Sequence, residues 1–269
     1  MSGDRSGTPA GPEVRAWPVP VLGDNYAWIL ARPGFPAGLV VDPGEAEPVL
    51  RALERLGLGA AGVLVTHHHA DHTAGVPEVA GALGCPVFGP RREPIPGVTR
   101  PVDDGDVLPL ETAGLEVTVL SVPGHTAGHV AWLAGGVVAT GDTLFGGGCG
   151  RLFEGTPARM FASLSRLAAL PVATRVCCGH EYTVANLRFA RRVEPGNHRL
   201  AARLREAETL RERGEPTVPS TVAEERATNP FLRCSQAQVV EGVARLAGRP
   251  VTPGLETFTI LRRLKDAAG

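Results

Sequence analysis

A short apolar run and a dense group of metal-binding side chains follow one another in Gly62-Val63-Leu64-Val65-Thr66-His67-His68-His69-Ala70-Asp71-His72. The run over 62–65 predicts a buried strand. In the extended chain that follows it, residues two apart point the same way, so His67 and His69 can face one point. Asp71 and His72 follow where the chain turns into a helix, and they can face a second point close by. The stretch therefore predicts two neighbouring groups of ligands at the end of one strand.

Three more candidate ligands each follow a strand-like run further along the chain. Loops at strand ends are where functional residues concentrate, because a rigid sheet holds them in place. The complete set has five imidazoles, two carboxylates and no thiolate, a combination that suits Zn²⁺, with Fe or Mn as alternatives. It exceeds what one tetrahedral ion uses, so it predicts two divalent ions that share a carboxylate. The candidate metal ligands are His67, His69, Asp71, His72, His125, Asp142 and His180.

The remaining histidines near these motifs are not assigned to a metal. In an extended chain His68 should point away from its two neighbours, and His198 lies in a turn. His129 could support the ligands from outside the site, but an ordinary buried histidine is the interpretation that we favour. A single histidine is more often a surface or hydrogen-bonded residue than a ligand, so the metal prediction depends on the whole set.

The mixture of strand-like and helical runs changes near residue 182. Short β-rich runs, some separated by helical stretches, precede this point, and helical runs dominate after it. We expect a disordered tail over 1–13, a mixed α/β domain over 14–182 and a helical domain over 183–269. The expected strands are 26–31, 38–41, 62–65, 115–122, 130–133, 136–139 and 174–178. The expected helices are 46–56, 74–83, 157–170, 183–193, 199–213, 236–247 and 256–266.

Composition excludes several classes of partner. The formal net charge of −1 leaves no basic field for nucleic acid or an anionic membrane. No apolar run approaches the roughly 18 residues that a membrane-spanning helix needs, and the N-terminus lacks the apolar stretch of a signal peptide. The five cysteines are odd in number and two are adjacent, which argues against a disulfide framework. We therefore expect a cytoplasmic protein without nucleic-acid or membrane partners.

The pattern Thr-His-x-His-x-Asp-His, followed by later His, Asp and His residues, resembles the metallo-β-lactamase superfamily, whose fold is an αββα sandwich. Further motifs narrow the resemblance to glyoxalase II, the hydroxyacylglutathione hydrolase family, from about residue 14 to the C-terminus. The resemblance implies that the α/β domain is catalytic and that the helical domain binds substrate. The motifs are GDTLF at 141–145, GCGR at 148–151, GHEYT at 179–183, NLRFA at 186–190, EPGN at 194–197, TNPF at 228–231 and RRxKD at 262–266.

The resemblance also implies a reaction and a role for each candidate ligand. The reaction is hydrolysis of S-(2-hydroxyacyl)glutathione, such as S-lactoylglutathione, to glutathione and a 2-hydroxy acid (D-lactate). A metal-bridging hydroxide would attack the thioester carbonyl, and Asp71 and Asp142 are the candidate catalytic carboxylates. The first metal would be held by His67, His69 and His125, the second by Asp71, His72 and His180, and Asp142 would bridge both.

The same resemblance implies a glutathione site formed by Arg151, Tyr182, Arg262 and Lys265. Phe153 stands where several relatives have tyrosine, so one hydroxyl contact to glutathione is expected to be missing. Arg262 and Lys265 are three residues apart, on one face of the last expected helix, and two cations there suit the carboxylates of glutathione. Without the resemblance, an ordinary solvated basic helix end would be the favoured interpretation.

Three alternative functions compete with this hypothesis. A persulfide dioxygenase of the same superfamily would use one iron and fewer of these ligands, and the complete set argues against it. A nuclease of the superfamily would want a basic face, which the net charge of −1 disfavours. A non-enzymatic metal-binding module would more often use a closed, cysteine-rich site. We expect a monomeric enzyme that acts on a small glutathione thioester.

Overall fold

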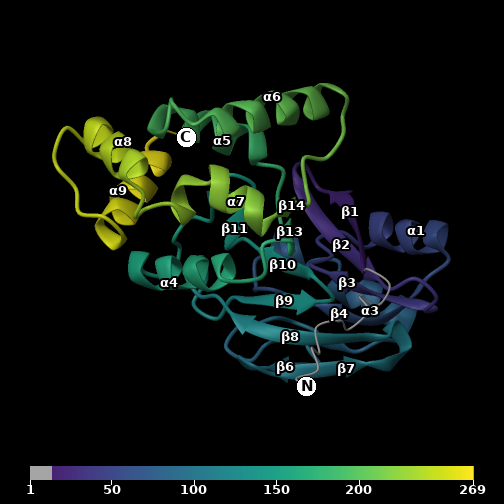
Figure 1. Cartoon of the computed structure of the whole chain (residues 1–269). Helices are drawn as coiled ribbons and strands as arrows, with labels where there is room; N and C mark the ends of the chain where they lie inside the picture. The colour runs from purple at the N-terminus through teal and green to yellow at the C-terminus, as the bar shows by residue number, and fades with distance from the viewer. Residues whose placement is uncertain (1–13, 269) are drawn as a thin grey trace, which may run out of the picture.

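Two six-stranded sheets packed face to face form the centre of residues 14–268, the part of the chain that the computed structural model describes (Figure 1). The expected disordered tail over 1–13 lies outside the described residues. Apolar side chains of both sheets meet between the layers, and helices cover the outer faces. The predicted αββα sandwich is therefore confirmed. None of the helices in residues 14–268 is both long and apolar enough to cross a membrane.

The first sheet contains, in spatial order, β1 (Arg15–Val21), β2 (Asn25–Ala31), β3 (Ala37–Val41), β4 (Gly59–Leu64), β5 (Val87–Pro90) and β6 (Arg100–Val102). Helices α1 (Ala46–Leu56), α2 (Ala70–Thr73) and α3 (Val76–Leu83) belong to its crossover connections. Side chains of β2 alternate between its two faces, as a strand requires. Trp28 and Leu30 enter the core between the sheets, whereas Ala27 and Ile29 join the apolar cluster beneath α1 and α3.

The second sheet contains, in spatial order, β14 (Ser220–Thr221), β13 (Arg175–Cys178), β10 (Val137–Gly141), β9 (Val130–Ala134), β8 (Leu115–Ser121) and β7 (Val107–Leu110). A small hairpin of β11 (Leu144–Phe145) and β12 (Gly148–Cys149) follows β10. The loops after β8, β10 and β13 carry His125, Asp142 and His180. The sheet therefore places these three residues beside the end of β4, as the sequence predicted.

The remaining helices pack on the outer face of the second sheet or on one another, and they extend beyond the sheet at the C-terminal end (Figure 1). Apolar residues of α4 and α9 share one cluster with β9, β10 and β13. The short strand β14 pairs with β13, so the segment after residue 182 also contributes to this sheet. The domain boundary expected at 182 stays a prediction. The helices are α4 (Pro157–Ala168), α5 (Thr183–Val193), α6 (His198–Glu212), α7 (Val222–Thr228), α8 (Ala237–Ala247) and α9 (Leu255–Asp266), with 3-10 turns at Glu111–Ala113 and Pro230–Leu232.

The sequence analysis missed β1, which contains Pro18 and Pro20. Proline cannot donate to a strand ladder, so it is confined to edge strands and bulges. β1 is the edge of the first sheet and pairs only with β2, in an antiparallel register that joins Arg15 to Ala31. The helix α7 was also missed, because it is short and begins after the N-cap residue Thr221, whose side chain accepts from the backbone of Glu224.

Glu256, in the first turn of α9, is expected to make the stability of the protein depend on pH in the acidic range. The Glu256 carboxylate accepts hydrogen bonds from the Thr252 backbone N–H (2.8 Å) and from Arg249 Nη1 (2.9 Å). Hydrogen bonding with the side chain and backbone of Thr252, and then with Arg249, lowers the pKa of Glu256 to about 2. Because the folded-state pKa lies below the unfolded value, the bonds stabilise the protein above about pH 4.5, and this contribution is lost as the pH falls toward 2. The difference in unfolding free energy between wild type and Glu256→Gln should therefore be constant above pH 5 and shrink on acidification. A difference that stays constant down to pH 3 would contradict this prediction.

Candidate metal centre and substrate pocket

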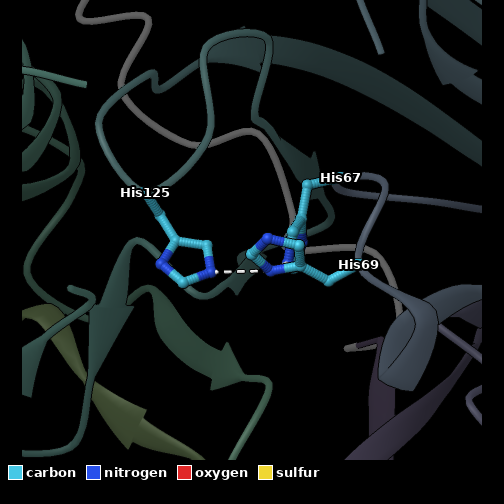
Figure 2. A group of neighbouring side chains, drawn as sticks. All are labelled: His67, His69 and His125. Atoms are coloured by element: carbon cyan, nitrogen blue, oxygen red, sulfur yellow. Dashed lines mark hydrogen bonds between the residues drawn. The ribbon is translucent and has the colours of Figure 1, made fainter. Parts of the chain in front are cut away.

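The first ligand group consists of His67, His69 and His125, which offer imidazole nitrogens within 4.8 Å of one another. His67 and His69 follow β4 along the chain, and His125 faces them from a separate loop after β8 (Figure 2). His69 Nδ1 lies 3.1 Å from Nε2 of both His67 and His125. Burial lowers the pKa of His67 and of His125, which favours the neutral imidazole that a metal binds.

The second ligand group consists of Asp71, His72 and His180, which also offer ligand atoms within 4.8 Å of one another. Asp71 and His72 lie on α2, and His180 follows β13. The Nε2 atoms of His72 and His180 lie 3.5 and 3.4 Å from Asp71 Oδ2. Hydrogen bonding with His180 holds the pKa of Asp71 well below its usual range, so this carboxyl is ionised. Burial alone would lower the pKa of His180, but hydrogen bonds to Asp142 and Asp71 raise it to about 10.

Asp142 lies between the two ligand groups, in the loop after β10. Its Oδ1 is 3.3 Å from His72 Nε2, and its Oδ2 is 3.4 Å from His125 Nε2 and 3.3 Å from His180 Nε2. Burial opposes ionisation, but the charge of His72 and the hydrogen bond from His180 hold the pKa of Asp142 well below its usual range. One ionised carboxylate therefore faces both ligand groups.

The donor set fits a pair of divalent cations. His72 Nε2 and Asp142 Oδ1 are buried and have no hydrogen-bond partner among the described residues, although they face each other across 3.3 Å. Buried polar atoms without a partner are rare in proteins and need an explanation. A cation between them would satisfy both atoms, and nitrogen and oxygen donors are ligands that zinc, iron and manganese accept.

Asp24, in the turn between β1 and β2, and Asn25, the first residue of β2, orient the second ligand group, and the sequence analysis did not identify them. His180 Nδ1 donates to Asp24 Oδ1 over 3.0 Å, and Asn25 Nδ2 donates to Asp71 Oδ2 over 2.8 Å. Contacts of this kind set the tautomer and orientation of metal ligands. Their only signal in the sequence is an Asp-Asn turn, which is common between strands without any such role.

Two further buried residues contact the ligands. His72 Nδ1 donates to Asp42 Oδ2 over 3.1 Å. The ring of His129 stacks on that of His67 at a centroid distance of 4.6 Å, and its Nε2 accepts from the Asp142 backbone N–H over 3.2 Å. His129 is therefore not the ordinary buried histidine favoured from the sequence. It reaches the ligands because the first residue of β9 is hydrogen-bonded to the chain just before His67.

A pocket of about 700 Å³ opens onto both ligand groups. Its wall combines candidate metal ligands with every residue that the sequence suggested for substrate binding. The pocket therefore offers a reacting centre and a binding surface in one cavity. The candidate metal ligands in its wall are His69, Asp71, His125, Asp142 and His180, and the candidate substrate residues are Arg151, Phe153, Tyr182, Arg262 and Lys265.

Two exposed aromatic rings frame the ligand groups. Phe153 is 64% exposed, and its ring meets those of His69 and His125 edge-on at centroid distances of 5.6 and 5.2 Å. The ring of Tyr182 stacks on that of His180 at 4.7 Å. Burial, with nearby carboxylates, raises the pKa of Tyr182 to about 12, so its hydroxyl keeps the proton and can donate to a ligand.

The three candidate cations differ in accessibility. Arg262 is only 4% exposed, and its guanidinium donates to Cys149 O (2.8 Å) and lies 3.0 Å from an Asp266 carboxylate oxygen. Its Nε is buried without a hydrogen-bond partner among the described residues. Arg151 is exposed, and Lys265 is half-buried, with a pKa lowered by burial and by the neighbouring arginines. Lys265, which lies over the Phe189 ring, and Arg151, which lies 3.8 Å from an Asp266 carboxylate oxygen, are therefore the more accessible cations, whereas Arg262 joins α9 to β12.

The fold and the arrangement of the candidate ligands are those of the metallo-β-lactamase superfamily, to which the chain belongs. The family model described as Metallo-beta-lactamase superfamily matches residues 27–180. The crystal structure of BLEG-1 B3 metallo-beta-lactamase has a TM-score of 0.62 at 22% identity and covers 81% of this chain and 99% of its own. TTHA1623 in a di-iron-bound form has a TM-score of 0.51 at 33% identity, over 61% of this chain and 91% of its own.

The C-terminal helices narrow the assignment within that superfamily. The family model described as Hydroxyacylglutathione hydrolase C-terminus matches residues 181–268. A protein of Alkalilimnicola ehrlichii named hydroxyacylglutathione hydrolase is 53% identical over 92% of this chain and 97% of its own length. The chain belongs to the hydroxyacylglutathione hydrolase family, which confirms the glyoxalase II resemblance.

Proposed function

We propose that this chain hydrolyses S-(2-hydroxyacyl)glutathione thioesters, such as S-lactoylglutathione, to glutathione and a 2-hydroxy acid. The observation that carries the proposal is a pocket of about 700 Å³ whose wall contains both Asp142, which faces both ligand groups, and the cations Arg151, Arg262 and Lys265. The relative that is 53% identical over almost the whole chain bears the name of this activity.

The proposed cofactors are two divalent ions, zinc in the first place and iron or manganese as alternatives. The first would be held by His67, His69 and His125, the second by Asp71, His72 and His180, with Asp142 shared. The di-iron form of TTHA1623 supports a pair of ions in this fold. When bound, such ions activate water as a nucleophile and polarise a carbonyl oxygen.

The chain itself would orient the reactants. Asp71, whose side chain is 40% exposed at the pocket wall and is held by Asn25, is positioned to orient the attacking water. The leaving thiol has an ordinary pKa near 8.5, so the carbon–sulfur bond can break without a dedicated acid. Tyr182, Arg151 and Lys265 would bind glutathione, and Arg262 would hold α9 in place beside them. The monomeric state and the cytoplasmic location expected from the sequence stay predictions.

Turnover of matched thioesters tests the proposal. The zinc-loaded chain should hydrolyse S-lactoylglutathione far faster than the lactoyl thioester of N-acetylcysteamine, which has the same reacting carbonyl but lacks the anionic tail. Equal rates for the two thioesters would remove the glutathione assignment. Absence of thioester hydrolysis together with oxygen uptake on glutathione persulfide would favour a persulfide dioxygenase, and absence of both would favour a metal-binding module.

Lys265→Ala should raise KM for S-lactoylglutathione and leave kcat nearly unchanged. A charge-assisted hydrogen bond contributes roughly 1.5–3 kcal/mol, which corresponds to about a tenfold to hundredfold effect. The contact of Lys265 with the anionic tail of glutathione is equally strong in the ground and transition states. Its loss therefore weakens the binding of both states by the same amount. Arg263→Ala, an exposed cation on the same helix outside the pocket, is the matched control and should keep the wild-type KM. An unchanged KM in Lys265→Ala would contradict the assignment of Lys265.

A further inference from the structure

His68, in the middle of the histidine-rich stretch, belongs to neither ligand group. It lies instead beside Glu93 and Glu154. Its Nδ1 donates a hydrogen bond to Glu93 Oε2, and its Nε2 is 3.3 Å from Glu154 Oε1. His68 therefore has partners of its own outside both ligand groups, although its ring still meets that of its neighbour His69 edge-on at a centroid distance of 5.0 Å.

Glu93 joins two separate loops through one buried carboxylate, whose side chain is only 1% exposed. Its Oε2 accepts from the His68 backbone N–H over 3.0 Å, and its Oε1 accepts from the Gly128 backbone N–H over 2.7 Å. A Cβ on Gly128 would come within 2.8 Å of Glu93 Cγ, so the close approach needs glycine at this position. The chain before Gly128 carries His125, and the chain around His68 carries His67 and His69.

Glu154 ties a third loop to the same cluster. Its Oε2 accepts from the Ala127 backbone N–H over 2.8 Å, and its own backbone N–H donates to His125 O over 3.3 Å. The adjacent Phe153 packs its ring against His125. The cluster of His68, Glu93 and Glu154 thus connects every chain segment that supplies the first ligand group. The second ligand group has separate supports in Asp24 and Asn25, whereas Asp42 contacts both groups, because it accepts from His72 Nδ1 and from the Thr66 backbone N–H directly before His67.

We propose that Glu93 is a positioning residue for the first ligand group, because it sets, through His68 and Gly128, the separation of His67 and His69 from His125. The inference rests on one part of the proposed function, namely that the first ligand group binds a divalent ion. Partners that orient metal ligands typically contribute 10–100-fold to metal affinity. Loss of the Glu93 contacts should therefore weaken the first site by that factor and leave the second site unchanged.

Glu93→Gln tests this inference without a change in side-chain size. Glutamine has one acceptor oxygen, so it cannot accept from both the His68 and the Gly128 backbone N–H groups. Zinc affinity of the metal-free protein would be measured against a competing chelator in two backgrounds. In the Asp71→Ala/His180→Ala background, which leaves the first ligand group intact, Glu93→Gln should weaken zinc binding by about 10–100-fold. In the His69→Ala/His125→Ala background the same change should have less than about a twofold effect.

Glu194→Gln is the matched control, because Glu194 is another buried carboxylate whose two oxygens accept from Arg233, at 2.9 and 3.1 Å. It should lower the melting temperature without changing either zinc affinity. If Glu93→Gln does not fold, His68→Gln replaces it; this change removes only the side-chain contact with Glu93 and should weaken the first site by a smaller factor, again without affecting the second site. The inference would be overturned if Glu93→Gln weakened zinc binding equally in both backgrounds, or if it did not weaken zinc binding in the Asp71→Ala/His180→Ala background. A third bound zinc ion that Glu93→Gln removes would also overturn it. A wild-type protein that binds no zinc would overturn the proposed function instead.

Discussion

Replacement of Asp142 by alanine is expected to lower kcat for S-lactoylglutathione by more than about 10³-fold. Residues that only orient metal ligands typically contribute 10–100-fold to metal affinity or activity, and the Asp142 carboxylate, 3.3–3.4 Å from histidines of both ligand groups, would itself be a ligand. Removing it takes a shared ligand from two sites at once. Steady-state kinetics with metal-saturated protein measures the loss, and elemental analysis should show fewer than two ions per chain.

The Asp142→Asn variant separates the charge of the residue from its size. An asparagine fills the same space and keeps one acceptor oxygen, but it cannot serve as an anionic bridge. It should lose most of the activity while unfolding at a temperature close to that of the wild type. If Asp142→Ala retained both ions and an activity within tenfold of the wild type, the shared-ligand assignment would be wrong.

Glu225→Ala should lower the free energy of unfolding by roughly 3–5 kcal/mol, the cost of leaving one partner of a buried ion pair unpaired. The Glu225 side chain is fully buried, and its Oε1 lies 2.6 Å from Nη2 of Arg203, which is 7% exposed. Its Oε2 accepts from the Gly147 backbone N–H (2.9 Å) and from Asn229 Nδ2 (3.0 Å). Because Gly147 lies in the turn between β11 and β12, Glu225 also holds that hairpin beside the pocket.

Urea unfolding of the variant measures this loss, and the neighbouring residue provides a control. Glu224 lies 3.5 Å from Arg203 Nε, but its side chain is 39% exposed. Exposed ion pairs contribute about 0–1 kcal/mol, so Glu224→Ala should remain within about 1 kcal/mol of the wild type. If the two variants lost equal amounts of unfolding free energy, burial would not explain the contribution of the Glu225–Arg203 ion pair to stability.

Local patterns in the sequence determined most of the helices and brought together the candidate ligands of the His67–His72 stretch. The expected helices at 46–56 and 183–193 agree with α1 and α5, because their apolar periodicity and their Gly and Pro boundaries are encoded within each segment. The alternation of side chains along an extended chain was enough to place His67 and His69 together. The sequence by itself also predicted which strand ends carry His125, Asp142 and His180.

Only the tertiary structure decided which residues support those ligands. Asp24 and His180 are 156 positions apart, and Glu93 is 35 positions from Gly128, so nothing local in the sequence marks them as partners. The accessibility of Arg262 was equally hidden: spacing placed it beside Lys265, but packing of α9 on β12 buries its guanidinium against Cys149. Hydrogen-bond partners and burial arise from the packing of distant segments, whereas helix periodicity and strand alternation are properties of the chain at short range.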